Sequence, residues 1–438
     1  MQVLQAYRYA VDSSPATESA LRSHVGARRF AFNWGLALVK GRLDARRRGE
    51  PVTIPWTMRA LRHEWNREKA VVAPWWRENS KEAYNAGFEG LANGLQAYFD
   101  SRGGKRCGRH VGFPAVKKRG RGRQSVRFTT GAIKVIDRTH IRLPRIGLLR
   151  THEHTTPLLK KLESGTARIL SATASLDGDR WHVSFTCQVE REVGQPTRPQ
   201  DGIGADAGLR GTVLSSGEVI SSPRPLRPAL KKIARLSREL ARRKQGSQGW
   251  RETKAKLRRA HARVRHIRED ATHKLTRRLA TSYGTVVAEH LGVSAMMRAP
   301  QLGRAVADAG LAEMRRQLTY KCAWYGSRFV AAPRQFPSSK TCSHCGAVKA
   351  TLPLWERVFR CEACGVVMDR DFNAAKNLAA LAAQGHHVAG SGPETQNARG
   401  RDVSPDAVGQ TRMKREAAPR LMGRAPLFRE ERRLETIK

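Results

Sequence analysis

Four cysteines near the carboxyl end form two close pairs whose spacing suits a metal site. Cys342 and Cys345 enclose two residues, as do Cys361 and Cys364, and fifteen residues separate the two pairs. Two C-x-x-C turns at this separation can bring four thiolates around one Zn²⁺ ion in tetrahedral geometry. Two disulfides or four unrelated buried thiols would use the same residues. We expect no signal peptide and hence a reducing cytoplasm, where thiols stay free or bind metal, so the spacing predicts one structural zinc.

Three carboxylates stand where a fold could bring them together. Asp206 lies in a segment of small and apolar residues that predicts a strand, where an acid is costly to bury unless it binds a cation. A glycine-bounded Asp is also common as a satisfied turn residue. Glu289 lies near the carboxyl end of a short apolar strand at 283–291, and Asp371 opens a helix. Acids placed so can hold two divalent cations about 4 Å apart on a phosphodiester, and their hard oxygens favour Mg²⁺ or Mn²⁺.

The charge of the chain points to a polyanionic partner. Its 438 residues include 81 Lys and Arg against 38 acidic residues, which gives a formal net charge of +43 and a pI near 11.2. Release of counterions from nucleic acid gives such a chain affinity for it without sequence preference. A membrane surface is the competing polyanion, but we find no apolar run of about eighteen residues and no lipidation signal. Nucleic acid is therefore the expected partner, and the length suggests about three domains.

The amino-terminal third reads as a short strand followed by helices. Residues 2–10 alternate loosely, and Pro15 follows serines at a helix entry. Apolar residues then recur at helical spacing over residues 21–39, 58–65 and 84–98. Their aromatic members could stack on bases, but side chains at 3.6-residue spacing more often form a core.

A flexible cationic loop is expected at residues 101–127, where glycine and basic residues replace the helical pattern. It could be a solvated linker, yet the absence of acidic residues from its basic run favours contact with phosphates. The candidate nucleic-acid ligands are Arg28 and Arg29 in the first helix and, in the loop, Lys117, Lys118, Arg119, Arg121 and Arg123.

Patterns of period two predict a small antiparallel barrel over residues 105–195. The clearest alternation runs from Trp181 to Val189, and Asp177-Gly178 before it is a hairpin signal, because Gly accepts the positive φ of a tight turn. A polar linker is expected at 191–201. A basic helical hairpin should follow at 226–280, with a break near 245–247.

The motifs of this chain resemble those of the TnpB family, which are insertion-sequence-encoded nucleases related to the type V CRISPR effectors. Residues 202–209 look like the first RuvC-type motif, residues 286–291 like the second and residues 369–375 like the third. Residues 337–342 precede the cysteines as in that family, and residues 29–34 look like its opening helix. The likeness covers about residues 1–385.

The resemblance implies a multidomain α/β protein whose catalytic acids are Asp206, Glu289 and Asp371. It implies an RNA-guided DNA endonuclease that binds a guide RNA transcribed from its element and a DNA target, with Mg²⁺ or Mn²⁺ in a ribonuclease H-like RuvC site. The implied domains are a β-barrel wedge (1–15 and 105–198), a helical recognition lobe (16–104), the RuvC-like nuclease (199–329 and 366–385) and an inserted zinc-ribbon module that binds target nucleic acid (330–365).

A few positions depart from the family pattern, and none removes a metal ligand. His290 follows Glu289 where an acid is commoner, and Ala205 precedes Asp206 where a larger apolar residue is usual. Asp369 competes with Asp371 for the third acidic role, and the resemblance favours Asp371, leaving Asp369 as a supporting or structural residue. Residues 386–438 predict a disordered basic tail.

Two further functions compete with a guided nuclease. A guide-bound DNA-binding regulator without cleavage would suit a family member that had lost its acids, and retention of all three acids argues against it. A strand-transferring transposase is an older label for such proteins, but the chain shows no separate acidic triad and no nucleophilic Tyr motif for that chemistry.

Overall fold

The computed structural model describes residues 1–383 apart from 107, 121 and 354, together with residues 395–396 and 402–403. The chain divides into two units, Met1–His386 and His387–Lys438. In the second unit strand β15 (Thr395–Gln396) pairs antiparallel with β16 (Asp402–Val403), and the rest of the predicted tail lies outside the described residues. Within the described residues, no helix combines the length and hydrophobicity that a membrane-spanning segment needs.

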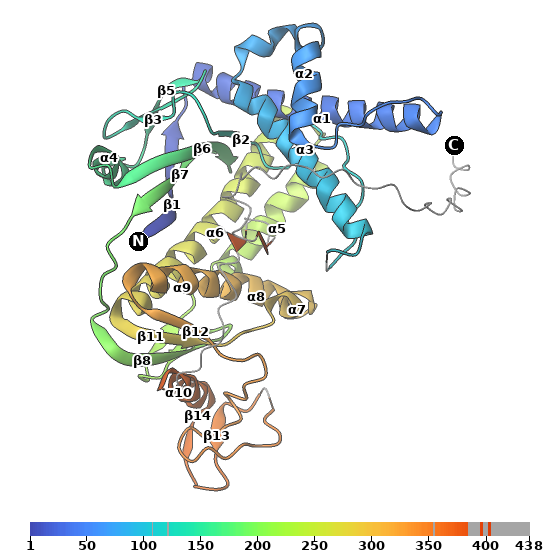
Figure 1. Cartoon of the computed structure of the whole chain (residues 1–438). Helices are drawn as coiled ribbons and strands as arrows, with labels where there is room; N and C mark the ends of the chain where they lie inside the picture. Colours follow the sequence, from blue (N-terminus) through green and yellow to red (C-terminus); the bar gives the residue numbers. More distant parts are fainter. Residues whose placement is uncertain (107, 121, 354, 384–394, 397–401, 404–438) are drawn as a thin grey trace, which may run out of the picture. The chain divides into compact units, whose positions relative to one another are not determined.

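The amino-terminal helices lie together in Figure 1, and they pack around an aromatic core. Ser14, Thr57 and Ser80 each cap the amino terminus of a helix with a side-chain oxygen. The ring centroids of Trp65 and Tyr84 are 4.9 Å apart, and both side chains are buried. The core interpretation of the aromatic pattern is therefore confirmed for these residues. The elements are α1 (Pro15–Arg47), α2 (Met58–Val72), the 3₁₀ helix η1 (Pro74–Glu78) and α3 (Lys81–Arg102).

A seven-stranded antiparallel sheet follows in the order β2-β6-β7-β1-β5-β4-β3. Its core is formed by alternate residues of β7 from Trp181 to Val189, all of which are buried, and the β6–β7 hairpin turns at Gly178 with φ +67°. Closure into a barrel stays a prediction, because no ladder joins β2 to β3 in the described part of the chain. The strands and their one short helix are β1 (Gln2–Asp12), β2 (Ser125–Phe128), β3 (Lys134–Val135), β4 (His140–Leu143), β5 (Gly147–Thr151), α4 (Thr156–Glu163), β6 (Ala167–Asp177) and β7 (Arg180–Glu190).

A second, mixed sheet has the order β10-β9-β8-β11-β12, in which β8, β11 and β12 run parallel. The predicted linker at 191–201 is too long, because β8 already begins at Arg198 and pairs there with Tyr283. Pairing with a distant strand has overridden the polar local composition. The strands are β8 (Arg198–Ala207), β9 (Gly211–Leu214), β10 (Val219–Ser221), β11 (Tyr283–Ala288) and β12 (Arg328–Ala331).

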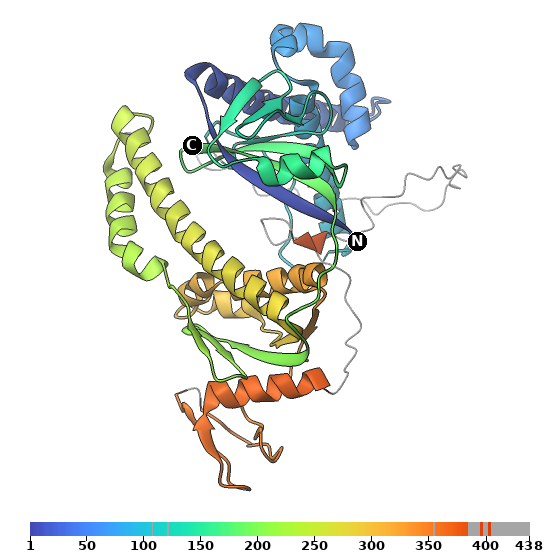
Figure 2. The same cartoon turned by 90° about the vertical axis from the view of Figure 1, so that its left-hand side faces the viewer.

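Helices cover both faces of this sheet (Figure 2). Leu279 of α6 and Leu318 of α9 pack with Ile203 on one face, whereas Leu378 and Leu381 of α10 pack with Val287 on the other. The predicted helical hairpin is present as α5 and α6, with its break at residues 243–247. The helices are α5 (Leu226–Arg242), α6 (Gln248–Ser282), α7 (Val293–Arg298), α8 (Gly303–Ala309), α9 (Leu311–Tyr325) and α10 (Arg370–Ala383), and the hairpin β13 (Val358–Arg360) and β14 (Val367–Asp369) precedes α10.

Candidate functional site

The four paired cysteines lie together, as their spacing predicts. Their four Sγ atoms all lie within 4.8 Å of one another. The Sγ atoms of Cys342 and Cys364 are 3.7 Å apart, and those of Cys345 and Cys361 are 3.5 Å apart. Each close contact therefore joins one cysteine of the first C-x-x-C pair to one of the second, as expected when both pairs surround one ion. The set fits a tetrahedral Zn²⁺ site.

Backbone geometry shapes each cysteine pair into the same turn. Gly346 (φ +78°) and Gly365 (φ +71°) follow the pairs in the left-handed conformation that glycine tolerates. Their amides donate hydrogen bonds to the carbonyl oxygens of Cys342 and Cys361, at 2.9 and 3.0 Å. Hydrogen bonds from the backbone N–H groups of Cys364 and Ala363, together with those of the neighbouring thiols, lower the pKa of the Cys361 thiol to about 6, whereas the neighbouring thiols raise the pKa of Cys364. We call this unit, residues 342–365, the zinc knuckle.

The three predicted acids come from three elements that meet at one edge of the mixed sheet. Ala205 of β8 is opposite Ala288 of β11 in a parallel register, so Asp206 is the next residue of β8 and Glu289 directly follows the end of β11. Side chains alternate along strands, which places both acids on the α10 face of the sheet. Asp371 lies in the first turn of α10. The structure thus brings the carboxylates of all three elements to one region.

Two glycines in β8 allow α10 to approach so closely. A Cβ atom at Gly204 would lie 1.9 Å from the carbonyl oxygen of Ala375, and one at Gly202 would lie 2.5 Å from the Cβ of Ala382. Both glycines share a strand face with Asp206. Sequence reasoning treated them only as part of a strand. Their alternation with Ile203 and Ala205 was the signal that a helix lies on this face.

The three acids act on one another electrostatically. Burial raises the pKa of Asp206 most, the negative charges of Glu289 and Asp371 also raise it, and Arg370 opposes the shift, so that this pKa is about 7. Among the described residues, the group of three or more side chains gathered closely enough to hold an ion is the four cysteines, and the three carboxylates are not gathered in that way. Asp206 is thus a buried carboxyl group close to other negative charges. A divalent metal ion would offset the repulsion among these groups, so the arrangement fits a site for such an ion.

Each of the other acids has a partner within the chain. Ser338 Oγ donates a hydrogen bond to Glu289 Oε1, and Arg357 lies 3.6 Å from Asp371 Oδ1. Asp369 Oδ1 accepts hydrogen bonds from the amides of Asp371 and Phe372, both at 2.9 Å. Asp369 therefore caps α10, which is the structural role that the sequence interpretation left for it.

Some of the predicted nucleic-acid ligands contact other parts of the protein, and others are exposed to solvent. Arg28 donates hydrogen bonds to Ser125 Oγ and to its carbonyl oxygen, so this guanidinium ties α1 to β2. Burial lowers the pKa of Arg29, and the nearby charge of Arg119 lowers it further, so these two cations lie close together. Lys117 lies over the ring of Phe32 at 3.5 Å, which anchors the loop on α1. Lys118 and Arg123 are exposed, and Arg121 lies outside the described residues.

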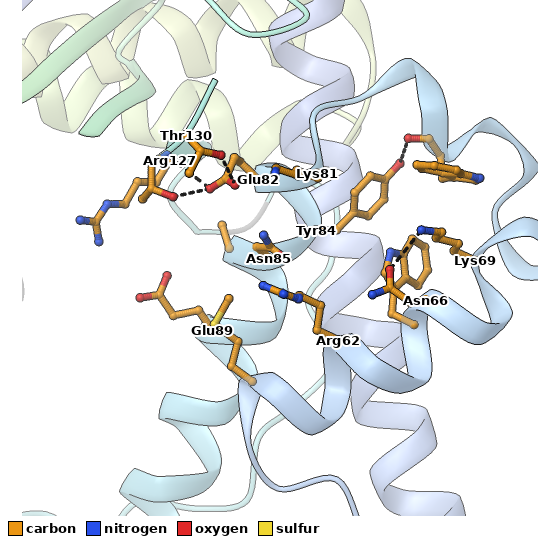
Figure 3. A pocket seen from close by; sticks show the side chains of 15 residues that line it. Arg62, Asn66, Lys69, Lys81, Glu82, Tyr84, Asn85, Glu89, Arg127 and Thr130 are labelled. Carbon is orange, nitrogen blue, oxygen red and sulfur yellow. Dashed lines mark hydrogen bonds between the residues drawn. The ribbon is translucent and has the colours of Figure 1, made fainter. Parts of the chain in front are cut away.

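A pocket of about 520 Å³ in the helical region is a feature that sequence reasoning missed (Figure 3). Four cations line it against two glutamates, and Glu82 is already held by the hydroxyls of Thr129 and Thr130. The Arg62 side chain extends toward the Asn85 amide in Figure 3. Its lining residues are Met58, Arg62, Trp65, Asn66, Lys69, Trp76, Lys81, Glu82, Tyr84, Asn85, Ala86, Glu89, Arg127, Thr129 and Thr130. They come from α2, η1, α3 and the end of β2. Because these elements are far apart along the chain, local sequence patterns could not predict the pocket.

The α5–α6 hairpin is the most basic element of the mixed-sheet region. Residues 226–282 contain 19 Lys and Arg against four acidic residues. The buried residues of α5 are Ile233 and Leu236, so most of its length faces solvent. Such a surface suits a phosphate backbone.

Three family models match the chain. The OrfB_IS605 model, described as "Probable transposase", matches residues 184–299, and the Cas12f1-like TNB domain matches residues 312–378. A helix-turn-helix model of the same OrfB group matches residues 1–48, which the structure forms as β1 and α1.

Similar whole proteins are known. A Mycobacterium tuberculosis protein (strain CDC 1551) described as "Putative RNA-guided DNA endonuclease" is 38% identical over 400 residues, which cover 86% of each chain. The InsQ protein of Escherichia coli K12, with the same description, is 29% identical over 417 residues, 91% of this chain and 96% of that one. A Cas12f1 chain from a complex with sgRNA and target DNA aligns with a TM-score of 0.44 at 14% identity, covering 86% of this chain and 99% of that one.

Proposed function

Since the chain belongs to the TnpB family, the OrfB proteins of IS605 elements, we propose that it is an RNA-guided endonuclease that cuts target DNA by metal-dependent hydrolysis. The catalytic acids are Asp206, Glu289 and Asp371. The observation that carries this assignment is their convergence on one edge of the mixed sheet, where the pKa of Asp206 rises to about 7. The metal is Mg²⁺ or Mn²⁺, because the ligands are carboxylate oxygens.

The three acids have different surroundings, which suits a shared metal site. Two bound divalent cations would hold the attacking water and the leaving oxygen of the scissile phosphodiester. Asp206 sits on the rigid strand, Glu289 is oriented by Ser338, and Asp371 is exchangeable because its Arg357 partner is 55% exposed. The chain thus offers one fixed, one oriented and one adjustable carboxylate to the metal.

Each sheet, the amino-terminal helices and the zinc module correspond to one proposed domain. We assign the mixed sheet and its helices (199–329 and 366–385) to a RuvC-like, ribonuclease H-like nuclease domain. The seven-stranded sheet (1–15 and 105–198) is the wedge domain, and the helices of 16–104 are the recognition lobe. The zinc module is 330–365, and it contacts target nucleic acid.

Recognition is divided between base pairing and the protein. The guide RNA, transcribed from the element, reads the target by base pairing, and the protein reads a short flanking DNA motif. The cations of α1, the 101–127 loop and the α5–α6 hairpin contact phosphates. The pocket of Figure 3 is our candidate for the flanking motif, because Arg62, Asn66 and Asn85 carry the side-chain types that read base edges.

Co-expression of the full chain with its flanking genomic DNA tests the proposal. The purified complex would be sequenced for RNA and incubated with Mg²⁺ and a plasmid that carries a guide-matched site beside randomised bases. Guide-dependent cleavage that EDTA removes supports the nuclease, and Asp206→Ala should cut at least about 10³-fold more slowly while it retains RNA. Target binding without cleavage would instead indicate the regulator, and cutting by Asp206→Ala at the parental rate would refute the acid assignment.

A further inference from the structure

The segment between β12 and the zinc knuckle is fastened to α10 by two buried asparagines. Asn377 Nδ2 donates to the carbonyl oxygens of Ser338 (2.7 Å) and Thr341 (2.6 Å). Asn373, one turn earlier, donates to the carbonyl oxygen of Thr341 (2.7 Å), and its Oδ1 accepts from the amide of Ser343 (2.9 Å). The two side chains are 7% and 0% exposed. Four hydrogen bonds therefore hold this short loop, residues 338–343, in one position on the helix.

The first end of the loop reaches a proposed catalytic acid. Ser338 is buried, and its hydroxyl donates to Glu289 Oε1 while Asn377 holds its carbonyl oxygen. In the described residues no Lys or Arg forms an ion pair with Glu289. A neutral hydroxyl fixes the orientation of the carboxylate without cancelling its charge. The hydrogen bond from Ser338 thus orients the carboxylate of Glu289, as a metal ligand requires.

The other end of the loop reaches the zinc knuckle. Asn373 binds the carbonyl of Thr341 and the amide of Ser343, the two neighbours of Cys342. Cys342 itself is 1% exposed and supplies one of the four clustered sulfur atoms. The same helix also carries Asp371 in its first turn. One helix therefore fixes a ligand of each metal site relative to the other.

We infer that Ser338, Asn373 and Asn377 are positioning residues that couple the zinc knuckle to the carboxylate site. This inference rests on the proposed function of that site. Asn377 holds Ser338, and Ser338 orients Glu289. Asn373 holds Thr341 and Ser343, where the folded knuckle keeps the far end of the loop in place. An aspartate at 377 could not donate to the two carbonyl oxygens it would face, so the position requires the amide.

The test compares Ser338→Ala with Ser339→Ala, the same change one residue away, in the full chain. Ser338→Ala should weaken Mn²⁺ binding, measured by EPR of the free ion, by about 5- to 10-fold. It should raise the Mg²⁺ concentration for half-maximal guided cleavage by a similar factor. Zinc content should remain one per chain, and Ser339→Ala should match the parent in Mn²⁺ affinity. Parental Mn²⁺ affinity and Mg²⁺ dependence in Ser338→Ala would overturn the inference.

A second variant separates positioning from simple support of the fold. Asn377→Asp keeps the side-chain volume and should also weaken Mn²⁺ binding about 5-fold while zinc stays bound. A lower melting temperature with unchanged Mn²⁺ affinity would show a structural role alone and overturn the inference. Failure of the proposed function looks different, because the parent would then bind Mn²⁺ no better than Asp206→Asn.

Discussion

The zinc knuckle and the carboxylate site are both predicted metal sites, yet the fold prepares them to different degrees. The four Sγ atoms already lie within 4.8 Å of one another, and two similar glycine-ended turns present them. The three carboxylates come from β8, from the residue that follows β11 and from α10, and two of them are paired, with Ser338 and Arg357. A closed structural site can be built locally, whereas a site that must also admit substrate depends on the packing of a sheet and a helix.

Removal of a zinc ligand should have the largest effect on the contrast between the two sites. Cys361→Ser should release zinc and lower guided cleavage at least about 100-fold, because metal binding supplies the folding free energy of such a small module. Zinc content by mass spectrometry and plasmid cleavage are the measurements. Glu362→Ser introduces the same residue at the neighbouring, exposed position and should keep one zinc per chain. Retention of zinc by Cys361→Ser would contradict the four-cysteine assignment.

Adding one methyl group between β8 and α10 should have the next largest effect. The Cβ of Gly204→Ala would meet the Ala375 carbonyl at 1.9 Å, so the helix that carries Asp371 must move. We expect a loss of about 3 kcal/mol or more in the free energy of unfolding and weaker Mn²⁺ binding, with zinc retained. Denaturant unfolding and Mn²⁺ titration measure these changes.

The matched control for that change is Gly41→Ala in α1. A Cβ there meets nothing within 4 Å, and alanine favours a helix, so stability should stay equal or rise by up to about 1 kcal/mol. If Gly204→Ala were as stable as the parent, α10 could not lie on β8 as described.

Local patterns predicted most of the elements and the cysteine cluster, whereas the carboxylate site, whose acids the family resemblance assigned, stays a prediction. The alternation in β7, the break between α5 and α6 and the cysteine spacing each depend on residues close in sequence. What the sequence could not reveal depends on residues far apart. Arg28 looked free for phosphate, but its partner Ser125 lies 97 positions away. The start of β8 at Arg198 likewise requires Tyr283, and the pocket of Figure 3 draws on four elements.

A smaller effect concerns the pH dependence of folding stability in the absence of metal, to which the carboxylate site contributes through Asp206. The pKa of Asp206 is about 7 in the folded chain, above about 4 for an unfolded Asp. The stability linked to this group is therefore full below about pH 4 and is lost as the pH rises through 7. Asp206→Asn cannot ionise, so without metal at pH 8 it should be more stable than the parent, by on the order of 2 kcal/mol.

Thermal melting at pH 5 and pH 8 measures that difference. Asp201→Asn, at an exposed position in the same strand, should melt like the parent at both values. Mg²⁺ should stabilise the parent and leave Asp206→Asn unchanged, which reverses their order. If Asp206→Asn were less stable than the parent at pH 8 without metal, burial of the ionised Asp206 side chain would not destabilise the folded protein.

The smallest effect concerns the exposed partner of Asp371. Arg357 and Asp371 are 55% and 39% exposed and 3.6 Å apart, so the pair contributes about 0–0.5 kcal/mol to stability. Arg357 competes with a cation for the carboxylate, whereas Ser338 aims Glu289 without neutralising it. Arg357→Ala should therefore tighten Mn²⁺ binding by up to about 3-fold, opposite in sign to Ser338→Ala. Arg360→Ala removes an equal charge from an exposed position of β13 and should change the affinity less. Weaker Mn²⁺ binding in Arg357→Ala would mean that this arginine organises the site, and the carboxylate site would then be prepared by the fold as fully as the zinc knuckle.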